Sequence, residues 1–196
     1  MYLSCEVNDI KVYDDFLEEE DRRNIWYLFM RNVDYEKKER IVPGLPWSWV
    51  YRVTQKDGMD PELEDEENYF FCHSVYVEGQ TVQPFTMKKL MPIIHKLDTE
   101  FENPLRALLR IKCNLGPRRH KRIRYGFHTD FDFPCTTAIY YINGNNGYTE
   151  FDIDGYGRYH CESVRNRLVI FPSHYKHSVV SCTDAKKRVL INFNWV

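Results

Sequence analysis

The second half of this sequence alternates apolar and polar residues with a period of two, and this pattern restricts the fold more than any other feature. The alternation begins in the segment 109–115, whose apolar members are Leu109, Ile111, Cys113 and Leu115. Such spacing predicts a strand with one buried face. Turn signals such as 144–147 separate further segments of strand character, at 136–143, 149–153, 160–164, 167–171, 177–181 and 188–195. Many short strands at even spacing predict a sandwich or a barrel.

Two helices are expected before this strand-rich region. After a short extended segment at 10–13, Asp15 and Glu18 are spaced like a capping box, which predicts a helix to about Arg31. Apolar residues at helical spacing predict a second helix over about 87–101, with Thr86 as its cap. The segment 43–68 is rich in Pro and Gly and ends in an acidic run, which is typical of a solvated loop.

Helices followed by an all-β module predict a single α+β domain. The expected fold is a double-stranded β-helix (a cupin-like jelly roll) with the N-terminal helices packed on one sheet. Residues of about 1–105 would form helical support and leading strands, and about 106–196 would form the jelly-roll catalytic core. A chain of 196 residues is long enough to bury such a core.

Charge and cysteine usage exclude several classes of protein. The 27 basic and 29 acidic residues nearly balance, which gives no argument for wholesale nucleic-acid binding. The six cysteines form no Cys-x-x-Cys pair. No apolar stretch approaches the roughly 20 residues that span a bilayer, and the N-terminus lacks the apolar region of a signal peptide. We therefore expect a cytoplasmic protein with reduced thiols and no membrane partner.

Three residues have the pattern of a metal site. His128 and Asp130 are two positions apart, so a strand would direct both side chains to one face. His177, at the start of a later strand, could supply a third ligand. Two imidazoles and one carboxylate on one side of an ion are typical of mononuclear iron(II) oxygenases. A hydrolytic zinc site could use the same three side chains.

Arg188 favours the first of these alternatives. It lies 11 residues after His177, in an alternating strand where Arg188, Leu190 and Asn192 share one face. A guanidinium that points into a barrel needs an anion. Its forked donors suit the distal carboxylate of 2-oxoglutarate, whose other end would chelate the iron.

At this point the sequence resembles a known family. The segment 125–130 matches a Tyr-x-x-His-x-Asp motif, 137–143 matches a strand of the form Thr-x-Ile-Tyr-Tyr-Leu-Asn, and 147–151 matches a Gly-Gly-x-x-x-Phe variant. Phe171, Pro172 and Ser173, followed by His177, match a Phe-Pro-Ser-x-x-x-His turn. Over about 108–195, the sequence is similar to the prolyl-hydroxylase-like branch of the 2-oxoglutarate and iron(II)-dependent oxygenases, in particular to small versions common in marine phages and bacteria.

The resemblance implies a role for each matching residue. Iron(II) would be bound by His128, Asp130 and His177. The distal carboxylate of 2-oxoglutarate would be bound by Arg188 and Tyr141, and Tyr125 would line the site as a catalytic residue. Dioxygen would be the oxidant and ascorbate a candidate reductant. The implied activity is hydroxylation of a peptide, a protein or a small molecule, with release of succinate and CO2.

Other functions stay open. The same residues could form a cupin-like metal-binding module without oxygenase turnover, or a degenerate oxygenase kept for binding. A nucleic-acid-directed oxygenase would carry a final strand of the form Arg-x-Asn-x-Thr-x-Arg. Arg188 is instead followed by Val-Leu-Ile-Asn-Phe-Asn, which disfavours that branch.

A basic loop precedes the metal motif. It could be a solvated loop, or a collar that recruits an acidic substrate to the mouth of the barrel. Its cationic residues are Arg118, Arg119, Lys121, Arg122 and Arg124.

Overall fold

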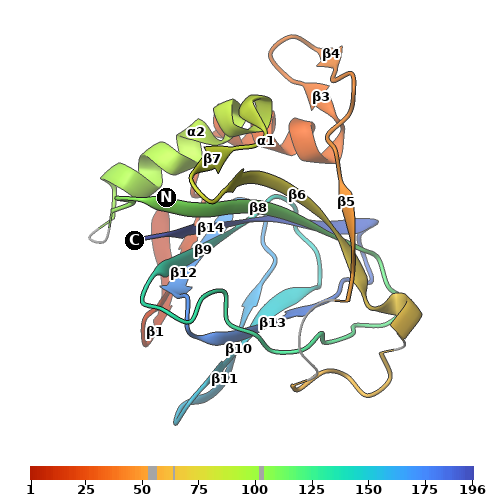
Figure 1. Ribbon diagram of the computed structural model, residues 1–196, viewed down its shortest axis with the longest axis vertical. Coiled ribbons are helices and arrows are strands. Elements are labelled where there is room, and N and C mark those ends of the chain that lie inside the picture. Colours follow the sequence, from red (N-terminus) through yellow and green to blue (C-terminus); the bar gives the residue numbers. More distant parts are fainter. Residues whose placement is uncertain (53–56, 64, 102–103) are drawn as a thin grey trace.

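The computed structural model describes residues 1–52, 57–63, 65–101 and 104–196, and within them it shows two antiparallel sheets (Figure 1). The larger sheet has nine strands. Eight follow the order β1 (Tyr2–Val7), β2 (Ile10–Asp14), β12 (Arg167–Pro172), β9 (Thr136–Tyr141), β14 (Lys187–Trp195), β8 (Leu108–Pro117), β6 (Tyr69–Val77) and β5 (Ser48–Tyr51). The ninth, β7 (Gln80–Thr81), pairs with β6.

The smaller sheet has the order β11 (Gly157–Glu162), β10 (Tyr148–Ile153) and β13 (Lys176–Val180). A separate hairpin joins β3 (Val33–Asp34) and β4 (Glu39–Arg40), and a short 3-10 helix spans Asp65–Glu67. The arrangement is consistent with a jelly roll, in which two sheets enclose a core.

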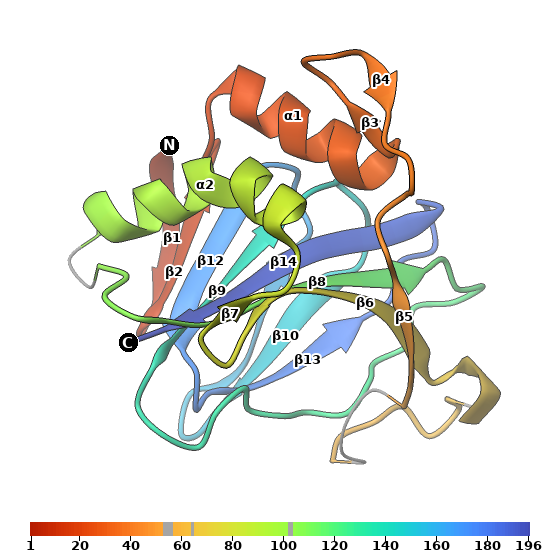
Figure 2. The same ribbon diagram turned by 45° about the horizontal axis from the view of Figure 1, so that its top comes forward.

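The helices α1 (Glu19–Met30) and α2 (Pro84–Thr99) lie over the larger sheet in Figure 2. Their buried apolar residues form one cluster with residues of the strands below them. On the helices these residues include Ile25, Leu28, Phe29, Leu90, Ile93 and Leu97, and on β14 they include Val189, Ile191 and Phe193. Burying each such side chain stabilises the fold by about 1.5–3 kcal/mol. Among the described residues, no helix combines the length and the apolar character that a membrane crossing needs.

A second cluster fills the space between the sheets. It contains Ile139 and Tyr141 of β9, Leu190 of β14, and Phe151 of β10. Because successive side chains of a strand point to opposite faces, β14 contributes its odd-numbered residues to the helix side and its even-numbered residues to the inter-sheet side. The alternation around Arg188 therefore places that arginine on the inter-sheet side, as the sequence predicts.

The predicted strands after residue 108 and both predicted helices are present, but other parts of the chain differ from the prediction. Segment 48–51, expected to be part of a loop, is strand β5, and the pattern also missed β6. Strand β6 has apolar or partly buried residues on both faces, so it shows no alternation.

The predicted helix caps are wrong. Glu18 is the N-cap residue of α1 but makes no side-chain capping bond, and Asp15 adopts a left-handed backbone with φ of 47°. Helix α2 starts at Pro84, a residue suited to a first turn because it has no N–H to leave unpaired. Thr86 is buried inside the helix, and its hydroxyl bonds Nε2 of His73 at 2.9 Å.

Candidate active site

The three predicted metal ligands meet between the two sheets. His128 and His177 pair as an isolated antiparallel bridge, with backbone N–H to O=C bonds of 3.0 and 2.9 Å in the two directions. The backbone N–H of Asp130 bonds the carbonyl of Ser173 at 3.1 Å, which orients the carboxylate toward the same point. The potential ligand atoms of all three residues lie within 4.8 Å of one another. His177 thus meets two residues that lie 47 and 49 positions earlier in the chain, as the sequence predicts.

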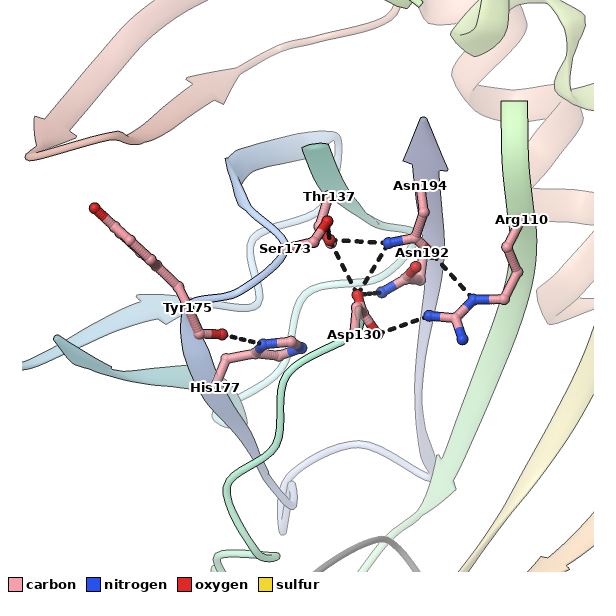
Figure 3. Close-up of polar contacts among 8 residues, drawn as sticks. All are labelled: Arg110, Asp130, Thr137, Ser173, Tyr175, His177, Asn192 and Asn194. Carbon is pink, nitrogen blue, oxygen red and sulfur yellow. Dashed lines mark hydrogen bonds and ion pairs between the residues drawn. The ribbon is translucent and has the colours of Figure 1, made fainter. Parts of the chain in front are cut away.

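A set of donors holds the Asp130 carboxylate in place (Figure 3). Its Oδ2 accepts hydrogen bonds from Asn192 Nδ2 at 2.9 Å, Asn194 Nδ2 at 3.1 Å and Thr137 Oγ1 at 3.1 Å. Its Oδ1 accepts one bond, from Arg110 Nη2 at 2.7 Å. A carboxylate offers about two acceptor positions on each oxygen. The less heavily bonded Oδ1 is therefore the oxygen with capacity left for a metal ion.

The same surroundings keep Asp130 ionised. Burial acts to raise the pKa of its carboxyl, while the interactions with His177 and Arg110 lower it. The hydrogen bonds from Asn192 and Asn194 act in the same direction, and the pKa lies below its usual range. An ionised carboxylate is the form that binds a cation.

Both imidazoles can present a lone pair to a metal ion. His177 Nδ1 lies 3.0 Å from the carbonyl oxygen of Tyr175, which can only accept, so this nitrogen carries the proton and Nε2 is free to bind. Burial lowers the pKa of His128 to about 3, and His177 contributes to the same shift. His128 is therefore neutral at physiological pH, as a metal ligand must be.

A cavity of about 240 Å³ lies beside these residues and extends to Arg188. The guanidinium of Arg188 is buried, and its Nε donates to Ser163 Oγ at 2.8 Å while Nη2 donates to Thr149 Oγ1 at 3.1 Å. No carboxylate of the described residues lies within ion-pair distance of it. Burial lowers its pKa. A buried guanidinium with only neutral partners is suited to binding an anion.

Tyr141 contacts both Arg188 and Thr149. Its ring lies beneath the guanidinium, 5.5 Å from centroid to Cζ, and its hydroxyl donates to Thr149 Oγ1 at 2.8 Å. Tyr141 is fully buried and is not among the described residues that line the cavity, whereas Thr149 is. Burial raises the pKa of Tyr141, so the phenol stays protonated.

Thr149 is a site residue that the sequence reasoning missed. Its Oγ1 accepts bonds from both Tyr141 and Arg188, so its own O–H is left to donate toward the cavity. The signal was its position in the matched segment 147–151, where Thr149 and Phe151 share one face of β10.

Tyr125 lines the cavity on the side of β13. Its hydroxyl accepts a bond from Arg119 Nε at 3.3 Å, and its backbone N–H bonds the carbonyl of Val179 at 2.9 Å. Burial raises the pKa of its phenol, which therefore stays protonated. The structure thus places Tyr125, as well as the three metal ligands and Arg188, around one cavity.

The basic loop is largely paired with acidic side chains. Arg119 is buried and donates to the backbone carbonyls of Glu67 and Tyr69, with the Glu67 carboxylate 3.9 Å away. Lys121 pairs with Glu62. Arg124 Nε lies 2.5 Å from Glu150 Oε2. Of the described residues that line the cavity, none belongs to the loop 118–124. The remaining cations, Arg118 and Arg122, are exposed.

Comparisons with known proteins agree with this arrangement at the level of the fold. No protein-family model matches the sequence, and a search among curated proteins gave no match. An oxidoreductase of the 2OG-Fe(II) oxygenase family from Burkholderia pseudomallei is similar in structure, with a TM-score of 0.65 and 11% identity, over 95% of this chain and 85% of that one.

Two prolyl hydroxylases are also similar. A prolyl hydroxylase from Trichoplax adhaerens, solved with a peptide fragment of the oxygen degradation domain of hypoxia inducible factor, has a TM-score of 0.57 and 14% identity over 96% of this chain and 84% of that one. A prolyl-4-hydroxylase from Pseudomonas putida has a TM-score of 0.53 and 16% identity over 95% of this chain and 92% of that one. The chain therefore has the fold of the 2-oxoglutarate and iron(II)-dependent oxygenases, prolyl hydroxylases included.

Proposed function

We propose that this protein is a 2-oxoglutarate-dependent, non-haem iron(II) dioxygenase that hydroxylates a substrate and releases succinate and CO2. One observation carries the proposal: a His-Asp-His group and a buried guanidinium, which has no carboxylate partner among the described residues, border the same cavity. A zinc hydrolase or a passive metal-binding module needs the first feature but has no use for the second.

The donor set fits iron(II). Two neutral imidazole nitrogens and one carboxylate oxygen are ligands suited to this ion, and three protein ligands leave positions for further ligands. Asp130 Oδ1, His128 and His177 would hold the metal. The donors on Oδ2 would fix the carboxylate in its binding orientation, as such outer contacts do at other metal sites.

The opposite end of the cavity fits the distal carboxylate of 2-oxoglutarate. Arg188 would supply the charge and Thr149 a hydroxyl donor. Tyr141 retains the role that the resemblance implies, and the geometry supports it through Thr149: its hydroxyl and its ring hold Thr149 and Arg188 in position. Charge-assisted bonds of this kind are roughly twice as strong as neutral ones.

When bound with 2-oxoglutarate and dioxygen, iron(II) would supply the oxidising chemistry. The protein's own part is to hold the ligands, to limit water in a partly enclosed cavity and to present the substrate. Tyr125 stays protonated and lines the cavity, where it can donate a hydrogen bond. Ascorbate remains a candidate reductant.

The proposal predicts slow conversion of 2-oxoglutarate to succinate without any substrate. Iron-loaded protein should form succinate in air, and it should form none without oxygen or with zinc in place of iron. Asp130→Ala should lose both the metal, by elemental analysis, and the succinate. Folded, iron-loaded wild-type protein that forms no succinate would contradict the proposal.

A further inference from the structure

The cavity carries more positive charge than iron and 2-oxoglutarate would neutralise. The lining residues that the structure describes and that are not exposed include one carboxylate, Asp130, and three cationic side chains, Arg110, Lys112 and Arg188. Iron(II) and the 2-oxoglutarate dianion carry equal and opposite charge. Binding both would therefore leave an excess of two positive charges in a partly enclosed space, where charges interact more strongly than in water.

Lys112 is the cation for which this excess matters most. Arg110 is engaged by Asp130, and Arg188 lies at the end assigned to the co-substrate. The ammonium of Lys112 lies over the ring of Phe70, 5.2 Å from its centroid. Within the described part of the chain it has no hydrogen bond and no carboxylate within ion-pair distance. Burial lowers its pKa, so an anion beside it would relieve an unfavourable environment.

Two amide oxygens next to Lys112 also lack partners. Asn192 is its cross-strand neighbour on β14, and Asn114 is two residues further along the same face of β8. The Oδ1 atoms of both are buried and have no hydrogen bond to the part of the chain that the structure describes, and both residues line the cavity. The amide of Asn192 cannot turn its nitrogen into the cavity without losing its bond to Asp130. The wall thus offers one cation and two hydrogen-bond acceptors.

We propose that the primary substrate carries a carboxylate or a phosphate that binds the ammonium of Lys112, next to an N–H or O–H group that donates to Asn114 or Asn192. This inference rests on the proposed function, because it assumes that 2-oxoglutarate occupies the Arg188 end. The volume of about 240 Å³ admits a small molecule or a terminal group beside the co-substrate. An acylated amino acid and a phosphomonoester both have the required chemistry.

The test uses protein loaded with nickel(II) and 2-oxoglutarate, which blocks turnover. Two pairs of probes are titrated by calorimetry: N-acetylglycine against N-acetylglycinamide, and methyl phosphate against methanol. The anionic member of at least one pair should bind and its neutral partner should not, and the pair that binds identifies the anion. Lys112→Met should weaken that binding tenfold or more, since a charge-assisted bond contributes about 1.5–3 kcal/mol. Lys112→Arg should restore much of it.

Arg122→Met is the matched control, because Arg122 is an exposed cation outside the cavity. It should bind the probe as wild type does. If 2-oxoglutarate binds but neither anion does, or if Lys112→Met binds the anion unchanged, the inference is wrong while the proposed function stands. If Lys112→Met instead weakens the binding of 2-oxoglutarate, Lys112 is part of the co-substrate site and the inference is again wrong. Failure of wild type to bind 2-oxoglutarate would overturn both.

Discussion

The cations of the basic loop and the cations of the cavity have opposite surroundings. In the loop, Lys121 and Arg124 pair with Glu62 and Glu150, and Arg119 is bonded to backbone carbonyls. In the cavity, the hydrogen-bond partners of Arg188 among the described residues are hydroxyl groups, and Lys112 lies over an aromatic ring. The loop is the more conspicuous cluster in the sequence, but the cavity holds the cations that are available to a ligand.

The difference shows that charge density along a chain is a poor guide to an anion site. Salt bridges and carbonyl contacts satisfy a cation as well as a ligand does, and they leave nothing for a ligand to gain. A cation that is buried without a carboxylate keeps its desolvation penalty until an anion arrives. The following predictions test whether the two groups of cations divide in this way.

Arg188→Met should produce the largest effect. Loss of a buried, charge-assisted contact costs about 2–5 kcal/mol, which corresponds to roughly a 30- to 4,000-fold weaker binding of 2-oxoglutarate. Metal content should be unchanged, because Arg188 contacts none of the three ligands. Elemental analysis beside a titration with 2-oxoglutarate measures both. An unaltered affinity for 2-oxoglutarate would show that Arg188 does not bind the distal carboxylate.

Arg119→Met should affect stability rather than co-substrate binding. Removal of the guanidinium takes a hydrogen-bond donor from the part-buried carbonyls of Glu67 and Tyr69 and from the buried hydroxyl of Tyr125. We expect a loss of about 2–4 kcal/mol in the free energy of unfolding, from the unsatisfied groups and the lost packing. Urea denaturation gives this value. A variant as stable as wild type, but with impaired substrate binding, would reverse the assignment of the loop.

Thr149→Val should weaken the binding of 2-oxoglutarate by roughly 10- to 150-fold, because a hydrogen bond to a charged carboxylate contributes about 1.5–3 kcal/mol. The change keeps the shape of the side chain but removes the hydroxyl that joins Tyr141 and Arg188. Metal content should again stay at the wild-type level. If the affinity for 2-oxoglutarate is unchanged, Thr149 supports the wall of the cavity without contacting the co-substrate.

Arg118→Ala should have the smallest effect. Arg118 is exposed, and exposed charges contribute little to stability. The free energy of unfolding should stay within about 0.5 kcal/mol of wild type, and succinate formation should not change. A loop that recruits an acidic substrate would instead show a raised KM in this variant at low salt, once a substrate is known. That result would indicate that the basic loop recruits the substrate to the mouth of the barrel.

The sequence pattern predicted the features of the site that lie within one strand or one motif. The spacing of His128 and Asp130 predicted a shared face, and the alternation around Arg188 predicted its inward direction. The donors to Asp130 could not be predicted, because Arg110 and Asn194 reach it only through the register of β8 against β14. The ion pairs of the basic loop could not be predicted either, because Glu62 lies 59 residues from Lys121.

Strand β6 is an element of the fold that the sequence pattern did not predict. Phe70 and Phe71 are adjacent, so their aromatic rings lie on opposite faces of the strand. One face borders the cavity and the other lies toward the helices. Without alternation, a strand is not distinguishable from a buried helical segment by its pattern alone. The part of the cavity wall formed by Phe70 could therefore not be predicted from the sequence.

The most direct test of the account is an anaerobic titration of iron(II)-loaded protein with two 2-oxo acids. 2-Oxoglutarate should produce the weak visible charge-transfer band of an iron chelate. 2-Oxobutyrate, which lacks the distal carboxylate, should need at least about 30-fold higher concentration for the same band, and Arg188→Met should abolish this preference. No band with 2-oxoglutarate in folded, iron-loaded protein, or equal affinity of wild type for the two acids, would contradict the account.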